Sequence, residues 1–289
     1  METTPQPAPP YLIVGGTGRT GRRVARSLAA RRFPVRITSR KGDPPFDWHD
    51  DSTWDASLRG IRRAYVAFHP HIAAAGAADL LARFAQRATE HGVQRLVLLS
   101  GRGEAAAQDV ETRVRELVAE CTVLRSSFFM QDFSEHFLLD AVRSGLLVMP
   151  AGDTAEPFID ADDLAEVAVH ALSCDDLVGR TLELTGQELL TFTDAARLLS
   201  QATGLPVGYR SCSVAEFAAG AVQEGMPEPE ARMVAEVFAQ VLDGRNAHRT
   251  DDLQHVLGRP GRRFSDYARQ TAATGIWSPD PATTQGGAP

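Results

Sequence analysis

Apolar and polar positions alternate with two different periods through the first two thirds of the chain. Short apolar runs predict buried strands at residues 11–14, 33–39, 63–69, 93–100 and 121–127, with a weaker strand at 45–49. The segments between them carry apolar residues at helical spacing and predict helices from about Arg19, around Leu58, and at 73–91, 108–119 and 128–145. Strands and helices alternating at this length predict right-handed crossovers. We therefore expect an α/β fold built on a doubly wound parallel Rossmann sheet.

This alternation changes after about Gly145, and helices then dominate. The pattern predicts a helix at 161–172, a strand at 180–186, helices at 193–203, 213–224, 228–242 and 264–274, and a strand at 205–211. We expect a sheet domain at residues 11–150, completed by 160–186, and a smaller, mostly helical domain at 187–277. The Pro-rich ends, residues 1–10 and 278–289, are expected to be disordered tails.

Composition narrows the classes of partner. The 289 residues carry a formal charge of -7, which argues against nucleic acid as the main partner. No apolar run is long enough to span a bilayer, and the first residues lack the apolar core of a signal peptide, so the cytoplasm is the expected compartment. Cys121, Cys174 and Cys212 lack CxxC spacing, which predicts buried, reduced thiols and neither a disulfide framework nor a metal site.

A glycine-rich turn joins the first predicted strand to the first predicted helix. Its residues are Gly15, Thr17, Gly18, Arg19, Thr20 and Gly21, with the glycines at G-x-x-G-x-x-G spacing. Gly15 would allow the tight turn, Gly18 the approach of a pyrophosphate, and Gly21 close packing of helix on sheet. The N–H groups at the helix start would then meet the phosphates. The alternative is a glycine-rich turn without a ligand, but the strand–turn–helix context favours a dinucleotide site.

The end of the second predicted strand distinguishes between the two nicotinamide cofactors. An NAD site places an acidic residue there to bind the ribose, whereas an NADP site uses basic residues for the 2′-phosphate. The strand ends on Ser39, Arg40 and Lys41, with no acid before Asp43. A guanidinium forms a strong, bidentate contact with a phosphate. The side chain of Arg19 could approach the same 2′-phosphate. We therefore expect NADP(H), against the alternative of a solvated basic turn.

Several stretches together carry a family resemblance over nearly the whole chain. They are "LIVGGTGRTGRRVARSL", "RLVLLSG", "TVLRSSFFMQDF", "PFIDADDLAEVAVHAL", "LELTGQELLTFTDAARLLSQATGLPV" and "VLGRPGRRFSDYARQTAATGIW". With them the chain resembles the NmrA-like branch of the atypical short-chain dehydrogenases/reductases. The "GRTG" form of the loop and "FDWHDDSTW" look closest to the subgroup that contains ergot-alkaloid-type reductases.

The resemblance implies positions for cofactor and substrate. On the cofactor it places Asp47 and Trp48 beside the adenine, Phe68 and His69 along its middle, Ser100 near the nicotinamide ribose, and Ser127 and Phe128 near the nicotinamide. On the substrate side it places Phe128, Met130, Gln131 and Phe133. Trp48 and Phe128 could instead be core aromatics, and Met130 and Phe133 are equally compatible with packing between the domains.

One expected feature of short-chain dehydrogenases is missing. Their Tyr-x-x-x-Lys pair supplies a proton, but Lys41 is the only lysine here and residues 105–120 hold no tyrosine. A ketone that accepts hydride needs its alkoxide protonated or stabilised, so ordinary ketone chemistry is in doubt. Ser100 and His69 are the candidate donors, and His71 is a weaker one.

Two functions remain open from the sequence. The first is an NADPH-dependent reductase that transfers hydride to an iminium, imine, quinone or conjugated acceptor in a small, secondary-metabolite-like molecule, without an acid pair. The second is an NADP(H)-binding regulator of the NmrA type, which would read the redox state of the dinucleotide and pass it to a protein partner. A sensor needs the dinucleotide site and no acid.

Overall fold

The computed structural model of the chain describes residues 8–278, and these divide into two compact units. The first unit comprises residues up to Ser126, Ala161–Leu184 and His255–Leu257. The second comprises Ser127–Asp160, Thr185–Gln254 and the residues from Gly258 on. The pattern of the sequence assigns residues 11–150 to the sheet domain, whereas the structure groups residues 127–150 with the second unit.

The first unit is built on a six-stranded parallel sheet, which confirms the predicted fold class. In order across the sheet its strands are β2 (Val35–Ile37), β1 (Tyr11–Val14), β3 (Arg63–Val66), β4 (Arg95–Gly101), β5 (Glu120–Ser126) and β7 (Thr181–Leu184). The central strands are almost wholly buried, because helices cover both faces of the sheet. Their sequences are accordingly continuous apolar runs rather than alternating ones.

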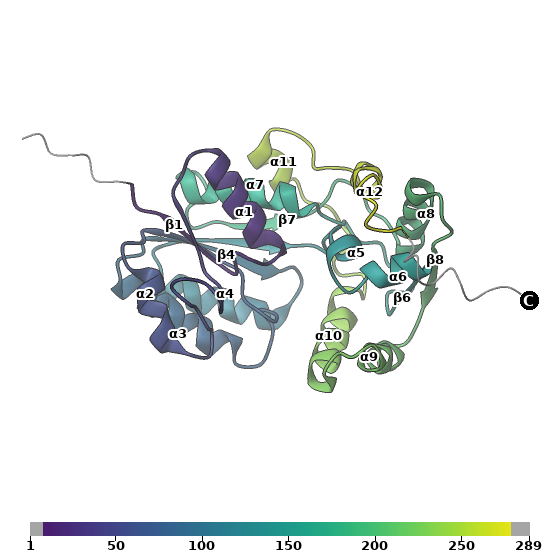
Figure 1. Ribbon diagram of the computed structural model, residues 1–289, viewed down its shortest axis with the longest axis horizontal. Helices are drawn as coiled ribbons and strands as arrows, with labels where there is room; N and C mark the ends of the chain where they lie inside the picture. The colour runs from purple at the N-terminus through teal and green to yellow at the C-terminus, as the bar shows by residue number, and fades with distance from the viewer. Residues whose placement is uncertain (1–7, 279–289) are drawn as a thin grey trace, which may run out of the picture. The chain divides into compact units, whose positions relative to one another are not determined.

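Two layers of helices cover this sheet (Figure 1). One face carries α1 (Arg19–Ala30) and α7 (Ala161–Ser173), and the other carries α2 (Trp54–Leu58), α3 (Ala77–Glu90) and α4 (Ala105–Leu117). A short 3-10 turn, η1 (Asp51–Thr53), precedes α2. Each helix buries an apolar face, as α1 does with Val24, Ala25 and Leu28.

The direction of winding reverses between β1 and β3. The chain passes from β1 through α1 to β2 on one side, and then crosses back to β3 on the other side of β1. In open α/β sheets, ligands bind outside the carboxyl ends of the strands at such a reversal. The loops that follow β1 and β3 are therefore where the fold positions a site.

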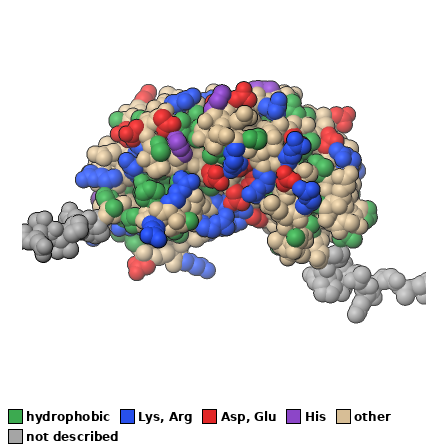
Figure 2. Space-filling view, turned by 90° about the horizontal axis from the view of Figure 1, so that it is seen from above, with side chains coloured by type: hydrophobic (Ala, Val, Ile, Leu, Met, Phe, Trp, Pro, Cys, Tyr) green, Lys and Arg blue, Asp and Glu red, His purple; other side chains and the backbone are tan. Residues whose placement is uncertain are grey.

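Ion pairs tie neighbouring helices of the first unit together. Arg23 of α1 donates to Asp162 of α7 at 2.9 Å, and Arg113 of α4 donates to Asp79 of α3 at 2.7 Å. Figure 2 shows basic and acidic side chains interspersed over one face of the molecule. The first pair is partly buried and the second is exposed. An exposed pair contributes about 0–1 kcal/mol, so apolar burial remains the main stabilising term.

The second unit combines a small sheet with short helices. Strands β6 (Leu146–Met149) and β8 (Gly208–Ser211) pair in parallel. The helices are α5 (Asp132–Glu135), α6 (Leu139–Ser144), α8 (Phe192–Thr203), α9 (Val214–Gln223), α10 (Glu228–Val241) and α12 (Phe264–Ala272), and α11 (Asp252–Leu257) contributes residues to both units. Capping boxes begin α8 and α9. Phe158 centres an aromatic core, 5.3 Å from Phe192 and 5.5 Å from Phe133 between ring centroids.

The structure corrects several sequence-based boundaries. Residues 45–49 form no strand within the described chain, only a bridge between Asp47 and Asp50. The helix expected at 73–91 begins at Ala77, and the single helix expected at 128–145 is two short ones, α5 and α6. The strand β6 and the helix α11 were not predicted. The predicted tails fall mostly on residues 1–7 and 279–289, outside the described residues.

Within residues 8–278, no helix is both long and apolar enough to cross a membrane.

Candidate functional site

The loop after β1 adopts the shape that its glycines allow. Gly15 has a φ of +76°, a left-handed conformation that side chains disfavour, and a Cβ there would lie 2.7 Å from the Ala67 carbonyl oxygen. A Cβ on Gly21 would overlap the carbonyl oxygen of Gly15. The loop therefore packs directly against the start of the loop after β3 and under the first turn of α1. These contacts explain both glycines without reference to a ligand.

The start of α1 presents uncapped backbone N–H groups. Gly18 is its N-cap residue and supplies no capping side chain, and the first turn contains no acidic residue. Thr17 and Gly18 are exposed, Arg19 is half-buried and Thr20 is buried. Uncapped amides at the positive end of a helix dipole form an anion site. The predicted residues of the turn thus lie together in an arrangement that fits a pyrophosphate.

The basic turn after β2 lies beside this loop. The backbone N–H of Thr38 donates to the Ile13 carbonyl oxygen at 3.2 Å, which brings the end of β2 alongside the end of β1. Ser39 is half-buried, and Arg40 and Lys41 are exposed. In the described part of the chain, neither basic side chain is paired with a carboxylate. Their charges are therefore available to an anion bound near Gly18.

The residues expected near the adenine belong to an aromatic cluster. Trp48 is only 8% exposed, and its ring centroid lies 4.9 Å from that of Phe68 and 5.0 Å from that of Phe46. Asp47 accepts the indole N–H of Trp54 on its backbone oxygen at 2.8 Å. Trp48 is thus placed as a core aromatic, while Phe68 and Asp47 remain half-buried. Adenine binding by these residues stays a prediction.

Ser100 and His69, the two stronger of the three candidate proton donors, differ in their exposure to solvent. His69 follows β3, is exposed, and precedes Pro70 across a cis peptide bond. Ser100, near the end of β4, is 3% exposed, and its hydroxyl donates to Oε1 of Glu111 at 2.6 Å. The hydroxyl hydrogen of Ser100 is therefore engaged inside the protein, whereas the imidazole of His69 is open to solvent.

Glu111 belongs to a buried ionic cluster that the pattern of the sequence does not predict. It accepts hydrogen bonds from Nε and Nη2 of Arg125 at 3.0 and 2.7 Å, and it is 3% exposed. Nη1 of Arg125 also lies 3.5 Å from Glu183, which accepts from Nε of Arg102 at 3.1 Å. Glu111 stands on the inner face of α4 among apolar residues, so the only sequence signal was a carboxylate at a core position.

Glu104 was also missed, although it follows β4 closely. It is 5% exposed, and its Oε2 lies 3.5 Å from Nδ1 of His71. The signal that could have found Glu104 was an acidic residue just after a buried strand, in "SGRGE".

The residues expected on the substrate side all lie in the second unit. Among them, Gln131 donates to Asp160 at 3.1 Å. Ser127, which was expected near the nicotinamide, lies in the same unit and donates from its hydroxyl to the Pro157 carbonyl oxygen at 2.6 Å. Met130 and Phe133 are 2% and 0% exposed, within the apolar core of this unit. Phe128 is half-buried, with its ring 5.6 Å from Phe192 and 5.8 Å from Phe238. Their contact with a substrate stays a prediction.

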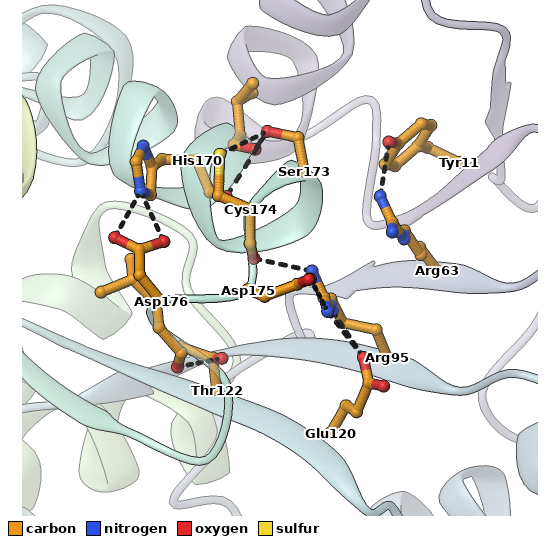
Figure 3. A network of polar contacts seen from close by, with 12 residues as sticks. Tyr11, Arg63, Arg95, Glu120, Thr122, His170, Ser173, Cys174, Asp175 and Asp176 are labelled. Atoms are coloured by element: carbon orange, nitrogen blue, oxygen red, sulfur yellow. Dashed lines mark hydrogen bonds and ion pairs between the residues drawn. The ribbon is translucent and has the colours of Figure 1, made fainter.

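The opposite, amino edge of the sheet is closed by ionic contacts (Figure 3). Arg95, the first residue of β4, is 3% exposed and donates to Glu120 at 2.8 Å, Asp175 at 2.6 Å and the Cys174 carbonyl oxygen at 2.7 Å. Arg63 donates to the Tyr11 hydroxyl nearby. These contacts hold the amino ends of neighbouring strands together.

One group on this amino edge could hold a metal ion. His170, Cys174 and Asp176 bring their ligand atoms within 4.8 Å of one another, and Nε2 of His170 lies 2.9 Å from Asp176 (Figure 3). Cys174 is exposed, so the expectation of buried cysteines was wrong for it, whereas Cys121 is buried. Three ligands on an exposed turn are fewer than the four of a structural zinc site, and we assign no metal to them.

A small pocket in the second unit contains none of the predicted residues. It is lined by Thr185, Gly186, Gln187, Arg249, Thr250, Asp251, Leu253, Gln254 and Gly261.

Comparisons with known proteins place the chain among reductases. No family model matches it. It is 32% identical to an uncharacterized oxidoreductase, YesF, of Bacillus subtilis, over 93% of this chain and 98% of the relative. It is 30% identical to agroclavine dehydrogenase of Claviceps fusiformis, over 89% and 95% of the two chains. It is 28% identical to NAD(P)H azoreductase of Xenophilus azovorans, over 91% and 98%.

Solved structures share the fold at lower identity. Triphenylmethane reductase of Citrobacter sp., complexed with NADP(H), aligns with a TM-score of 0.73 and 21% identity over 90% of this chain and 99% of that one. An NADPH-dependent quinone oxidoreductase of Escherichia coli, complexed with NADPH, aligns with a TM-score of 0.74. The two chains are 20% identical over 90% of this chain and 99% of that one. NmrA, a negative transcriptional regulator, in complex with NADP, aligns with a TM-score of 0.70. The two chains are 16% identical over 94% of this chain and 97% of that one.

The predicted family is supported by the glycine turn before α1 and by the parallel sheet. It is also supported by relatives that are 30–32% identical over nearly their full length. The chain belongs to the NmrA-like family of atypical short-chain dehydrogenases/reductases, and the subgroup of ergot-alkaloid-type reductases fits it.

Proposed function

We propose that the chain is an NADPH-dependent reductase that transfers hydride to an iminium, imine, quinone or conjugated acceptor in a small molecule. One observation carries the proposal: the start of α1, which has no capping side chain, follows β1, and the exposed Arg40 and Lys41 follow the end of the neighbouring strand β2. A dinucleotide with a 2′-phosphate carries negative charge at both places. The oxidoreductase names of the relatives support the same class of reaction.

Different residues of the first unit would bind different parts of the cofactor. The amides around Gly18 would bind the pyrophosphate, because they are uncapped and lie at the positive end of α1. Arg40 would bind the 2′-phosphate through its guanidinium, with Lys41 as a second cation. When bound there, NADPH would supply the hydride. The protein's own contribution is to hold the nicotinamide and the acceptor in reacting geometry.

The acceptor class is inferred from chemistry. The chain lacks the Tyr-x-x-x-Lys pair, so an acceptor that stabilises added electrons is favoured over a simple ketone. Azo, quinone and triphenylmethane groups appear in the names of similar proteins, and all three are conjugated and electron-poor. A cationic acceptor becomes neutral on gaining hydride and needs no proton at all.

The experiment is NADPH oxidation against a panel of acceptors under single-turnover and steady-state conditions. The panel contains a cyclic iminium ion, a quinone, a neutral azo dye and a cationic triarylmethane dye. We expect turnover with at least one of them, and a marked preference for NADPH over NADH. Tight NADPH binding without oxidation by any acceptor would contradict the reductase. Such a result would favour the regulator of the NmrA type, which has the same fold.

A further inference from the structure

Glu104 is a buried carboxylate at the carboxyl edge of the sheet. It stands three residues after β4 and directly before α4, and it is 5% exposed. Its side chain folds back over Gly101, where an added Cβ would overlap the carboxyl group. Its Oε2 is buried and has no hydrogen-bond partner among the described residues. Burying an unpaired, ionised oxygen is costly, so this carboxyl group favours its protonated form.

The imidazole of His71 faces that oxygen from the loop after β3. Its Nδ1 lies 3.5 Å from Oε2 of Glu104 and accepts the backbone N–H of Ala73. A ring nitrogen that accepts a hydrogen bond carries no proton, so the neutral imidazole holds its hydrogen on Nε2. The His71 side chain is 34% exposed and that of Glu104 is 7% exposed. His71 therefore stands between the buried acid and solvent.

His71 faces Glu104 from the loop after β3, and the charge of Glu111 acts on it from α4. Burial, and after it the charge of Glu111, raises the pKa of Glu104 to about 7. Burial lowers the pKa of the His71 imidazole. Both shifts favour the uncharged forms, so a carboxylic acid faces a neutral imidazole in a large share of molecules near neutral pH.

We propose that Glu104 and His71 form a proton relay that completes the reduction of neutral acceptors. The relay depends on the reductase function proposed above and supplies the acid that the Tyr-x-x-x-Lys pair would otherwise provide. Both residues lie in loops at the carboxyl edge of the sheet, and the loop of His71 begins at Ala67, which packs against Gly15 of the glycine turn. His71 would meet the acceptor, and Glu104 would act through it.

An azo acceptor shows how protons and electrons balance. Hydride adds to one nitrogen, the N=N π bond breaks, and its electron pair moves to the other nitrogen. Nε2 of His71 donates its proton to that nitrogen, and Nδ1 takes the proton of Glu104. The product is a hydrazine. Water then reprotonates Nε2 of His71, which is the more exposed partner, and Nδ1 returns its proton to the Glu104 carboxylate, so both residues regain their starting forms.

A cationic triarylmethane dye separates the relay from hydride transfer, because its central carbon gains hydride and becomes neutral without a proton. We would compare kcat for this dye and for a neutral azo dye in the parent chain, Glu104→Gln, His71→Asn and Glu116→Gln. Glu116 is an exposed glutamate on α4, so it serves as the matched control.

The expected result is selective. Glu104→Gln and His71→Asn should lower kcat for the azo dye by about 100-fold, the usual contribution of a general acid, and leave the cationic dye nearly unchanged. Equal effects on both dyes, or none on the azo dye, would overturn the relay while leaving the reductase intact. Reduction of neither dye by the parent chain would instead count against the reductase.

The proton on Glu104 can also be observed directly, in a measurement that does not depend on turnover. Difference infrared spectra of the parent chain and Glu104→Gln should show the carbonyl band of a buried carboxylic acid that disappears as pH rises through about 7. His71→Asn should shift that band, because it removes the facing nitrogen. A Glu104 that is already ionised at about pH 5, as an ordinary glutamate would be, contradicts the relay whatever the turnover shows.

Discussion

Ser100 donates the hydrogen of its hydroxyl group to Oε1 of Glu111 across 2.6 Å, and both residues are buried. Glu111 in turn is held by two nitrogens of Arg125. This arrangement gives a serine at the carboxyl end of β4 a structural partner. A short-chain dehydrogenase would use a serine in that region for catalysis, so the contact bears directly on the reaction.

The substitution Ser100→Ala should therefore reduce the stability of the fold more than it reduces turnover. We expect the free energy of unfolding to fall by about 1 kcal/mol, the typical value of a lost hydrogen bond. The Kd for NADPH should stay nearly unchanged, and kcat should fall far less than the ~100-fold expected for a lost general acid. Urea unfolding, calorimetry with NADPH and steady-state rates would measure these quantities. If turnover fell roughly 100-fold while stability was unchanged, Ser100 would instead be the proton donor.

Gly21 and Gly220 make a matched pair of glycine substitutions. A Cβ at Gly21 would overlap the carbonyl oxygen of Gly15, so Gly21→Ala should distort the turn and weaken NADPH binding strongly. Gly220 lies within α9 with nothing within 4 Å of its added Cβ. Gly220→Ala should raise the free energy of unfolding by about 0.5–1 kcal/mol, because alanine favours helix, and leave cofactor binding alone. Unchanged NADPH affinity in Gly21→Ala would refute the proposed fit of the turn.

The ionic contacts of Arg95 predict a stability defect that spares the site. Arg95→Met should lower the free energy of unfolding by about 1–2 kcal/mol. The value is modest because the partners left behind, Glu120 and Asp175, are 41% and 88% exposed and can be hydrated. Arg95 stands at the amino edge of the sheet, so the Kd for NADPH should not change. A large loss of NADPH affinity in a folded Arg95→Met chain would argue against a site at the carboxyl edge.

The raised pKa of Glu104 predicts how stability depends on pH. The folded chain holds this proton up to about pH 7, whereas the unfolded chain releases it near 4.5. The folded state therefore binds more protons between these values, and the free energy of unfolding falls as pH rises through this range, by up to about 3 kcal/mol. Burial lowers the pKa of His71, which acts in the opposite direction: the folded imidazole resists protonation, so this contribution to the free energy of unfolding is lost as pH falls below the ordinary histidine value of 6.5.

Glu104→Gln isolates the carboxyl contribution, since glutamine does not titrate. The parent chain should lose stability relative to this variant as pH rises from about 5 to about 8, as followed by urea unfolding at each pH. A difference between the two chains that does not change with pH would mean that Glu104 titrates as an ordinary glutamate.

The sequence predicted the sheet well because its strands are continuous apolar runs. The strands at Tyr11, Arg95 and Glu120 were placed to within one or two residues, since buried parallel strands carry a strong signal. The segment at 128–145 was mistaken for one helix because α5 and α6 share a helical apolar spacing, and only tertiary packing separates them. The strand β6 was missed because four apolar residues alone do not distinguish strand from helix.

The candidate site was predictable in one part and hidden in another. Glycine spacing and the basic residues at 39–41 are local in sequence, so the cofactor turn could be found directly. The pairing of Glu104 with His71 joins residues from two different loops, and the Ser100–Glu111–Arg125 cluster joins β4, α4 and β5. No single stretch of sequence displays such contacts, because they arise only when neighbouring strands bring their carboxyl ends together.

The most direct test of the central claim is calorimetric titration of Arg40→Ala with NADPH and with NADH. Arg180, exposed just before β7 at the amino edge, gives the matched control Arg180→Ala. A guanidinium that binds the 2′-phosphate contributes about 1.5–3 kcal/mol, so Arg40→Ala should weaken NADPH binding at least tenfold and leave NADH binding nearly unchanged. Equal losses for both dinucleotides, or no heat of binding for NADPH in the parent chain, would contradict the account.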